Sequence, residues 1–182
     1  MITNPILKVT TSDIEHFSDY YQVKLENVIE YISTLIDHVS YVIEYGNKIG
    51  VNEYQLSIHD LSKLSYAELP YYIKRFTYDT ITEDIKLEFD YAWHHHVIKN
   101  PHHHEHWVIS PTYIIPMPYN YILEMVADWH GANMAYQKSW NSTEWLKKNL
   151  PRMKLHSMTK SQLIDILHQC GYSFINEDSF NV

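Results

Sequence analysis

Apolar residues recur at steps of three and four in the first quarter of the chain, the spacing that gathers side chains on one face of an α-helix. This stripe consists of Leu25, Val28, Ile32, Leu35, Val39 and Val42. His38 lies three residues after Leu35 and four before Val42, so the spacing predicts that its ring faces the buried side. Gly46 and Gly50 offer places where this helix can end.

Similar spacing indicates further helices along the rest of the chain. We expect them at 51–64, 68–76, 85–99, 119–136, 142–150 and 159–171. Three residue pairs have capping-box spacing and would start helices: Ser12–Glu15, Ser65–Glu68 and Thr159–Gln162. The helix at 119–136 would bury Ile122, Met125, Val126 and Trp129. Asp128 lies at the edge of that stripe, and the proline-rich segment 110–120 is predicted to be a loop.

These patterns favour an all-α fold, a helical bundle formed by one domain over residues 1–182. The chain has 4 glycines, and it shows no internal repeat and no low-complexity linker. A formal net charge of −8 argues against a surface for nucleic-acid polymers, which bind clustered Lys and Arg. Cys170 is the single cysteine, so an internal disulfide is excluded and a reducing compartment is expected.

The ends and the hydropathy of the chain point to the cytoplasm. The first residues lack the basic start and apolar run of a signal peptide. No apolar stretch reaches the length of about 18 residues that a membrane span needs. We therefore expect a cytoplasmic protein with no membrane partner. The pattern leaves oligomerisation open.

The segment AWHHHVIKNPHHHEHW, residues 92–107, holds seven of the thirteen histidines. Pro101 disfavours helical geometry at Asn100, so the helix before it should end there. Asn100 can then cap, and Pro101 can open, a new turn that begins with the second group of histidines. Because successive helical residues point about 100° apart, His94, His95 and His96 cannot all face one ion.

Four positions outside this run also carry ligand chemistry. His38 is followed by the adjacent pair His59 and Asp60, and Asp128 comes late on another helix. Imidazole supplies a neutral nitrogen and carboxylate a hard, charged oxygen, so the four can converge on one divalent ion. Each also has an ordinary structural interpretation, as a hydrogen-bonded core histidine or a buried carboxylate paired with Arg or Tyr.

The order His…His-Asp…Asp resembles the HD-domain metal-dependent phosphohydrolase superfamily. HDLSK at 59–63 is similar to the His-Asp-x-x-Lys form of its branch that cleaves cyclic dinucleotides, although the Gly-Tyr-Pro segment of that branch is absent. That branch also has a later histidine, matched here by His95 or His96, and a His-His-Glu, matched by HHHE at 102–105. Over its whole length the chain resembles an uncharacterised bacterial and phage family through the motifs HD-x-SK, AW-x-HH, NPHH and MVADW. This resemblance implies the cytoplasm of a bacterium, or that of the host cell if a phage encodes the protein.

The resemblance implies a site with one or two divalent transition-metal ions, of Fe, Mn, Zn, Co or Ni. The implied metal ligands are His38, His59, Asp60, His95, His96, His102, His103 and Asp128. Asp60 would bridge to a second ion held by one member of each histidine pair, 95/96 and 102/103. His94, His104 and His106 fall outside the shared motifs and would be dispensable.

The function implied is a metal-dependent hydrolase of a small phosphorylated, nucleotide-like molecule. Asp60 and Lys63 would be the catalytic residues, and Lys63, Arg75 and Asn100 would contact the substrate. A solvent-facing lysine is the ordinary interpretation of Lys63. Two other functions fit the same residues: a mixed-valent di-iron oxygenase of the HD fold, and a protein that binds a nucleotide without cleaving it.

Overall fold

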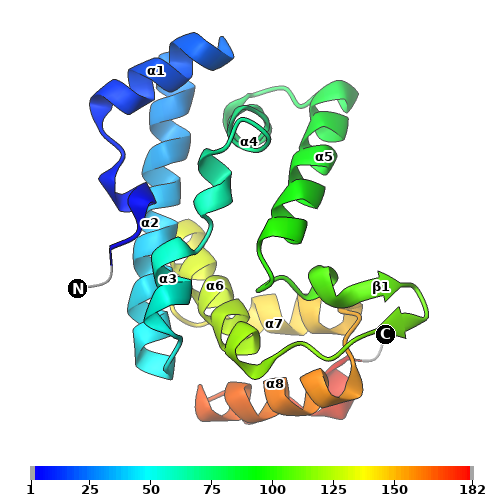
Figure 1. Ribbon diagram of the computed structural model, residues 1–182. Coiled ribbons are helices and arrows are strands. Elements are labelled where there is room, and N and C mark those ends of the chain that lie inside the picture. The colour runs from blue at the N-terminus through cyan, green and yellow to red at the C-terminus, as the bar shows by residue number, and fades with distance from the viewer. Residues whose placement is uncertain (1–2, 181–182) are drawn as a thin grey trace. The chain divides into compact units, whose positions relative to one another are not determined.

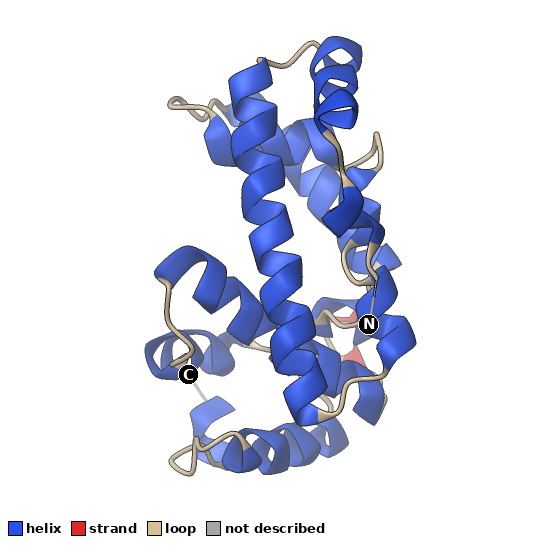
Figure 2. Ribbon diagram, turned by 90° about the vertical axis from the view of Figure 1, so that its left-hand side faces the viewer, coloured by secondary structure: helices blue, strands red, loops and turns tan. Residues whose placement is uncertain are grey.

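A computed structural model describes residues 3–180 and shows eight α-helices in that part of the chain (Figures 1 and 2). The α-helices are α1 Thr11–Tyr21, α2 Leu25–Ile49, α3 Glu53–Ile58, α4 Leu69–Thr77, α5 Glu83–Lys99, α6 Tyr119–Gln137, α7 Thr143–Asn149 and α8 Ser157–Gln169. The same part of the chain has five 3-10 helices, of which the first precedes α1 and the last follows α8: η1 Pro5–Lys8, η2 Leu61–Leu64, η3 His104–Trp107, η4 Leu150–Arg152 and η5 Glu177–Phe180. The predicted all-α class is confirmed.

The strands among the described residues form one small hairpin. β1 (Val108–Ser110) pairs antiparallel with β2 (Tyr113–Ile114), and Val108 lies opposite Ile114. The prediction of a loop at 110–120 is therefore wrong at its start. None of the described helices combines the length and the apolar composition that crossing a bilayer requires.

Close backbone contacts divide the chain into two compact units. The first consists of the described residues up to Ser40 together with Ser57–Asn100. The second consists of Tyr41–Leu56 together with the described residues from Pro101 onward. Helix α2 supplies residues to both units. The expected single domain over 1–182 stays a prediction.

The first unit is built on the N-terminal part of α2 and on the packing of α4 against α5 (Figure 1). Val28, Ile32 and Val39 on α2 are fully buried, as the stripe predicts. His38 shares this face and is 4% exposed, so the prediction that it faces inward is confirmed. The unit therefore places an imidazole within its apolar core.

The second unit has α6 as its central helix, in contact with α8. Its predicted inner face is confirmed, because Ile122, Met125, Val126 and Trp129 are all buried. Gly131 continues this face, and an added Cβ there would lie 2.4 Å from Cγ2 of Val42 and 2.8 Å from its backbone nitrogen. The glycine is therefore required by the close approach of α2 to α6 within this unit.

Three helix starts differ from the sequence prediction. Thr10 and Asp13, rather than Ser12 and Glu15, form the capping box of α1. Helix α8 begins at Ser157, where the ring of His156 accepts from the backbone N–H of Met158. Glu68 precedes α4 but makes no side-chain cap. Several polar residues within one turn can all meet the spacing rule, so the rule alone does not choose among them.

The predicted helix over 51–64 is also wrong in its second half. Helix α3 ends at Ile58, and Asp60 has φ 58° and ψ 10°, in the left-handed region. Asp adopts this conformation more readily than most residues, because its short polar side chain can bond locally. His59 and Asp60 therefore lie in a turn before η2. Adjacent side chains in a turn need not point about 100° apart, as they do in a helix.

Candidate metal centre

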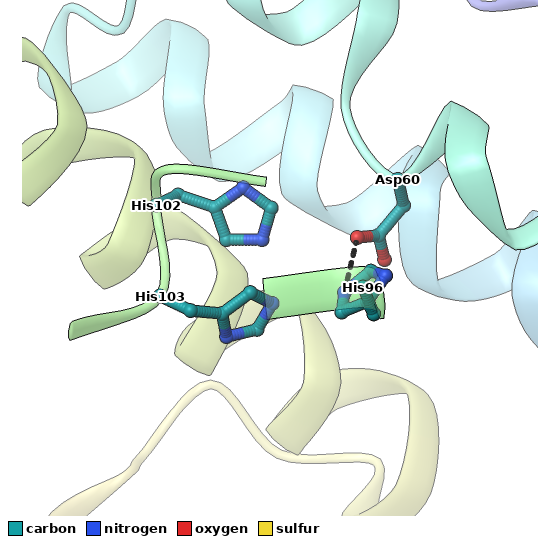
Figure 3. Close-up of side chains that lie close together, drawn as sticks. All are labelled: Asp60, His96, His102 and His103. Atoms are coloured by element: carbon teal, nitrogen blue, oxygen red, sulfur yellow. Dashed lines mark ion pairs between the residues drawn. The ribbon is translucent and has the colours of Figure 1, made fainter. Parts of the chain in front are cut away.

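Three imidazole rings surround the carboxylate of Asp60 in the first unit. Nε2 of His38 lies 3.1 Å from Oδ2 of Asp60, and Nε2 of His59 lies 3.6 Å from the same oxygen. Nε2 of His96 lies 3.3 Å from the other oxygen, Oδ1 (Figure 3). All four side chains are buried. The sequence prediction that His38, His59 and Asp60 come together is thus matched by the structure.

The separations between these atoms suit ligands that share an ion. Donor atoms bound to one metal at about 2.1 Å, with angles between about 90° and 110°, lie about 3.0–3.4 Å apart. The His38 and His96 distances fall within that range and the His59 distance is slightly longer. The ligand atoms of His38, His59 and Asp60 all lie within 4.8 Å of one another. This buried cluster could hold a metal ion.

Lys63 supplies the positive charge nearest to the carboxylate. Its Nζ donates to Oδ2 of Asp60 over 2.6 Å, and its side chain is 16% exposed. Burial raises the pKa of Asp60, but Lys63 and His59, together with hydrogen bonds to His38 and His96, hold that pKa well below its ordinary value. Asp60 is therefore an ionised carboxylate in the core, the form that binds a metal.

Glu68 is a functional candidate that the sequence analysis missed. Its carboxylate is fully buried; Oε1 lies 2.7 Å from Nδ1 of His95, and Oε2 lies 2.8 Å from Nδ1 of His96. Burial raises the pKa of Glu68, but hydrogen bonds and the charge of His96, with the bond to His95, bring it below its ordinary value. The sequence analysis assigned Glu68 to a capping box, because its spacing from Ser65 is that of a helix start.

The first histidine group separates into three environments. His96 is buried and contacts both Asp60 and Glu68, whereas the side chain of His95 is 34% exposed and contacts Glu68. His94 is exposed, as expected for a position outside the shared motifs. Of the pair that the sequence left open, His96 is the member beside Asp60. Burial lowers the pKa of His96, but its bonds to Asp60 and Glu68 outweigh burial and raise it.

The two further substrate contacts proposed from the sequence have structural partners. The side-chain amide of Asn100 donates to Oγ of Ser62 over 2.7 Å and to the backbone oxygen of His96 over 2.8 Å. The guanidinium of Arg75 lies 5.6 Å from the ring centres of Phe76 and Phe89. These contacts hold both side chains in place, and their role toward a substrate stays a prediction.

The second unit contains the remaining predicted ligands and a buried pair of its own. Nδ1 of His102 lies 3.1 Å from Oε1 of Glu124, whose other oxygen accepts from Nε2 of Gln55 over 2.7 Å. The ring of His103 lies 4.3 Å from that of His102 (Figure 3) and is half-buried, as is Asp128, one helical turn after Glu124. The predicted turn after Asn100 is present at Pro101 and His102, and the short helix η3 begins at His104.

Glu124 also escaped the sequence analysis, although the sequence contains a signal for it. Glu124 and Asp128 are four residues apart on one helix, which places both carboxylates on the same face. Acidic residues at this spacing, beside a buried apolar stripe, indicate a shared polar environment. The remaining histidines of the second group, His104 and His106, are half-buried members of η3.

Comparison with known proteins gives one match. The model of a family of unknown function, DUF5662, matches residues 27–169, more than three quarters of the chain. The matched region includes every candidate ligand in both units. No curated protein and no solved structure matches.

Proposed function

We propose that this chain, which belongs to the DUF5662 family of unknown function, is a metal-dependent hydrolase of a small phosphorylated molecule. One observation carries the proposal: three Nε2 atoms face the two oxygens of one buried, ionised carboxylate. A soluble domain rarely buries a charge unless it is paired or binds a metal. The compartment we propose is the cytoplasm.

The donor set fits a divalent transition metal. Imidazole nitrogens with one carboxylate suit Fe, Mn, Zn, Co and Ni better than Mg or Ca, which prefer oxygen. His38 and His59 face one oxygen of Asp60 and His96 faces the other, so Asp60 could bridge two ions. Asp128 and one of His102 or His103 stay ligands that only the sequence pattern predicts.

A divalent metal would supply an acidified water molecule as nucleophile and positive charge toward phosphoryl oxygens. The residues of this chain do the rest. Asp60 holds the negative charge that retains the cation in a buried place. Lys63, partly exposed beside Asp60, can turn its ammonium group to a phosphoryl oxygen. A compact phosphate needs only such a small cationic site, which agrees with a chain of net charge −8.

The test begins with the purified protein and its metal content. Elemental analysis should find transition metal in the native chain and much less in Asp60→Asn. A panel of nucleotides and simple phosphate esters should then release phosphate with the native chain, and this release should disappear in the variant. Equal turnover by the native chain and Asp60→Asn across the panel would refute the hydrolase proposal.

Because Asp60 could bridge two ions, a second candidate is a di-iron oxygenase. Imidazoles on both carboxylate oxygens make a nitrogen-rich set that suits iron. The protein would then be isolated with two iron atoms and a visible or paramagnetic signal that changes under oxygen. If it instead retains a nucleotide that is recovered intact, the chain is a binding protein and both enzyme proposals fail.

A further inference from the structure

We propose that Glu68 is a positioning residue, which fixes the orientation and tautomer of His95 and His96 so that each ring presents the lone pair of Nε2. For His96 that lone pair is directed to the Oδ1 side of Asp60. The inference rests on the proposed metal site for its consequence. The tautomers of the two imidazole rings can be measured in the metal-free protein.

The geometry of Glu68 is that of a carboxylate shared between two rings. Side chains of adjacent helical residues point about 100° apart, so His95 and His96 would ordinarily have separate partners. Nδ1 is the ring nitrogen nearer the backbone, and both Nδ1 atoms lie within 2.8 Å of Glu68, one on each oxygen. One fully buried side chain therefore restrains both rings.

The tautomer follows from hydrogen-bond chemistry. An ionised carboxylate only accepts, so the two Nδ1 atoms must each carry the hydrogen that they share with Glu68. A neutral ring protonated at Nδ1 has its lone pair at Nε2, the arrangement by which carboxylates prepare histidines for metals. For His96, Nε2 lies 3.3 Å from Oδ1 of Asp60, so it donates a hydrogen to Asp60 while the ring is charged and would present its lone pair to a metal that displaces this proton.

The other neighbours of His96 do not decide its tautomer. Oγ of Ser62 lies 3.3 Å from Nδ1 of His96, and Nδ2 of Asn100 lies 3.0 Å from the same atom. The amide of Asn100 is a donor and already reaches two oxygens, including that of Ser62. The competing charged acceptor is Asp60, but its Oδ1 lies 3.3 Å from Nε2 whereas Oε2 of Glu68 lies 2.8 Å from Nδ1, so the neutral ring keeps its hydrogen on Nδ1.

A helix-capping role does not account for Glu68. The residue precedes α4 at the N-cap position, where φ is −124° and ψ is −53°, and its side chain makes no cap hydrogen bond. Both of its oxygens are directed to α5 instead. A buried carboxylate that leaves the start of its own helix uncapped, while holding two rings of another helix, acts on those rings.

The experiment uses nitrogen-15 NMR of the imidazole rings in the metal-free chain, at a pH high enough to make them neutral. His95 and His96 should both show the Nδ1-protonated tautomer. In Glu68→Gln the amide has one acceptor and one donor group, so one of the two rings must switch to the Nε2-protonated tautomer. Nε2-protonated rings in the native chain would overturn the proposal, and this measurement needs no variant to fold.

Metal affinity is the second measurement, with Mn²⁺ or Zn²⁺ titrated into each folded variant. Loss of an outer-shell partner costs about 10–100-fold in affinity, and we expect that loss in Glu68→Gln but not in Glu88→Gln. Glu88 is a matched control because it is a half-exposed glutamate that pairs with Lys74. Unchanged affinity in Glu68→Gln would overturn the link to the metal. Correct tautomers in a chain that binds no divalent metal would uphold the positioning role and refute the proposed function instead.

Discussion

Replacing Lys63 with Met should destabilise the metal-free protein far more than the loss of an ordinary lysine. Lys63 donates to Asp60 over 2.6 Å, and the carboxylate that it leaves behind is fully buried. Removing one partner of a buried ion pair costs about 3–5 kcal/mol, because the remaining buried charge loses the opposite charge that compensated it. Met preserves the length and the apolar stem of the side chain, so the loss reports the charge rather than the packing.

The chain contains a matched control for this prediction. Lys86 pairs with Glu83 over the same 2.6 Å and the same spacing of three residues, but those side chains are 51% and 88% exposed. Exposed pairs contribute about 0.2–1 kcal/mol. For a chain of this length about 1 kcal/mol shifts the melting temperature by about 2–4 °C. Lys63→Met should therefore lower it by at least about 6 °C, and Lys86→Met by at most about 4 °C.

The assay is thermal unfolding in a chelator and again with a divalent transition metal. A metal at 100 times its dissociation constant stabilises the folded state by about 2.7 kcal/mol. Because the ion would neutralise Asp60 in place of Lys63, metal should restore much of the lost stability in Lys63→Met. Equal melting temperatures of Lys63→Met and Lys86→Met in the chelator would refute the reasoning about the buried charge. If the metal does not restore stability to Lys63→Met, the inference that the ion can neutralise Asp60 in place of Lys63 is refuted.

Three further predictions concern single residues. Burial lowers the pKa of His130, so its neutral form should stabilise the fold fully above the ordinary value of 6.5 and lose that contribution as the pH falls below it. The urea midpoint of His130→Gln should therefore depend less on pH, between 7.5 and 5, than the urea midpoint of the native chain. An equal pH dependence of the two midpoints would contradict this. His94→Ala should retain the native metal content by elemental analysis, whereas His96→Ala should lose metal, and the opposite order would reverse their assignment. Gly131→Ala should destabilise by about 1–3 kcal/mol or more in chemical denaturation, since its Cβ would meet the backbone of Val42; a stability equal to the native chain would show that α2 and α6 can separate at no cost.

The long helices α2 and α6 could be predicted from the sequence because each is long enough to show its own period. The stripe on α2 and the inner face of α6 needed no knowledge of their partners, since burial follows directly from spacing. The residues at which the elements begin and end were harder to predict from the sequence. The turn at Asp60 depends on one residue in the left-handed region. The spacing of apolar residues does not predict the backbone angles of a single residue.

The candidate site was predictable where chemistry is local and hidden where it depends on packing. His59 and Asp60 are adjacent, and His38 faces inward by spacing alone. Glu68 became a site residue only because α4 packs against α5, which brings its carboxylate to two rings 27 and 28 residues away. The same limit applies to choosing between His95 and His96, because the rotation of α5 about its axis is set by its neighbours.

The division of the histidine run explains why it is not a surface tag. The first unit ends at Asn100 and the second resumes at Pro101, so the two histidine groups belong to different units. Each histidine group has one buried imidazole, and a buried carboxylate lies close to its Nδ1: Glu68 beside His96 and Glu124 beside His102. A tag or a solvated face would have no reason to bury a carboxylate behind its rings, since each such group costs desolvation that only a specific pairing offsets. The repeated pairing therefore favours His96 and His102, one from each group, as the members of the two histidine pairs to test first as metal ligands.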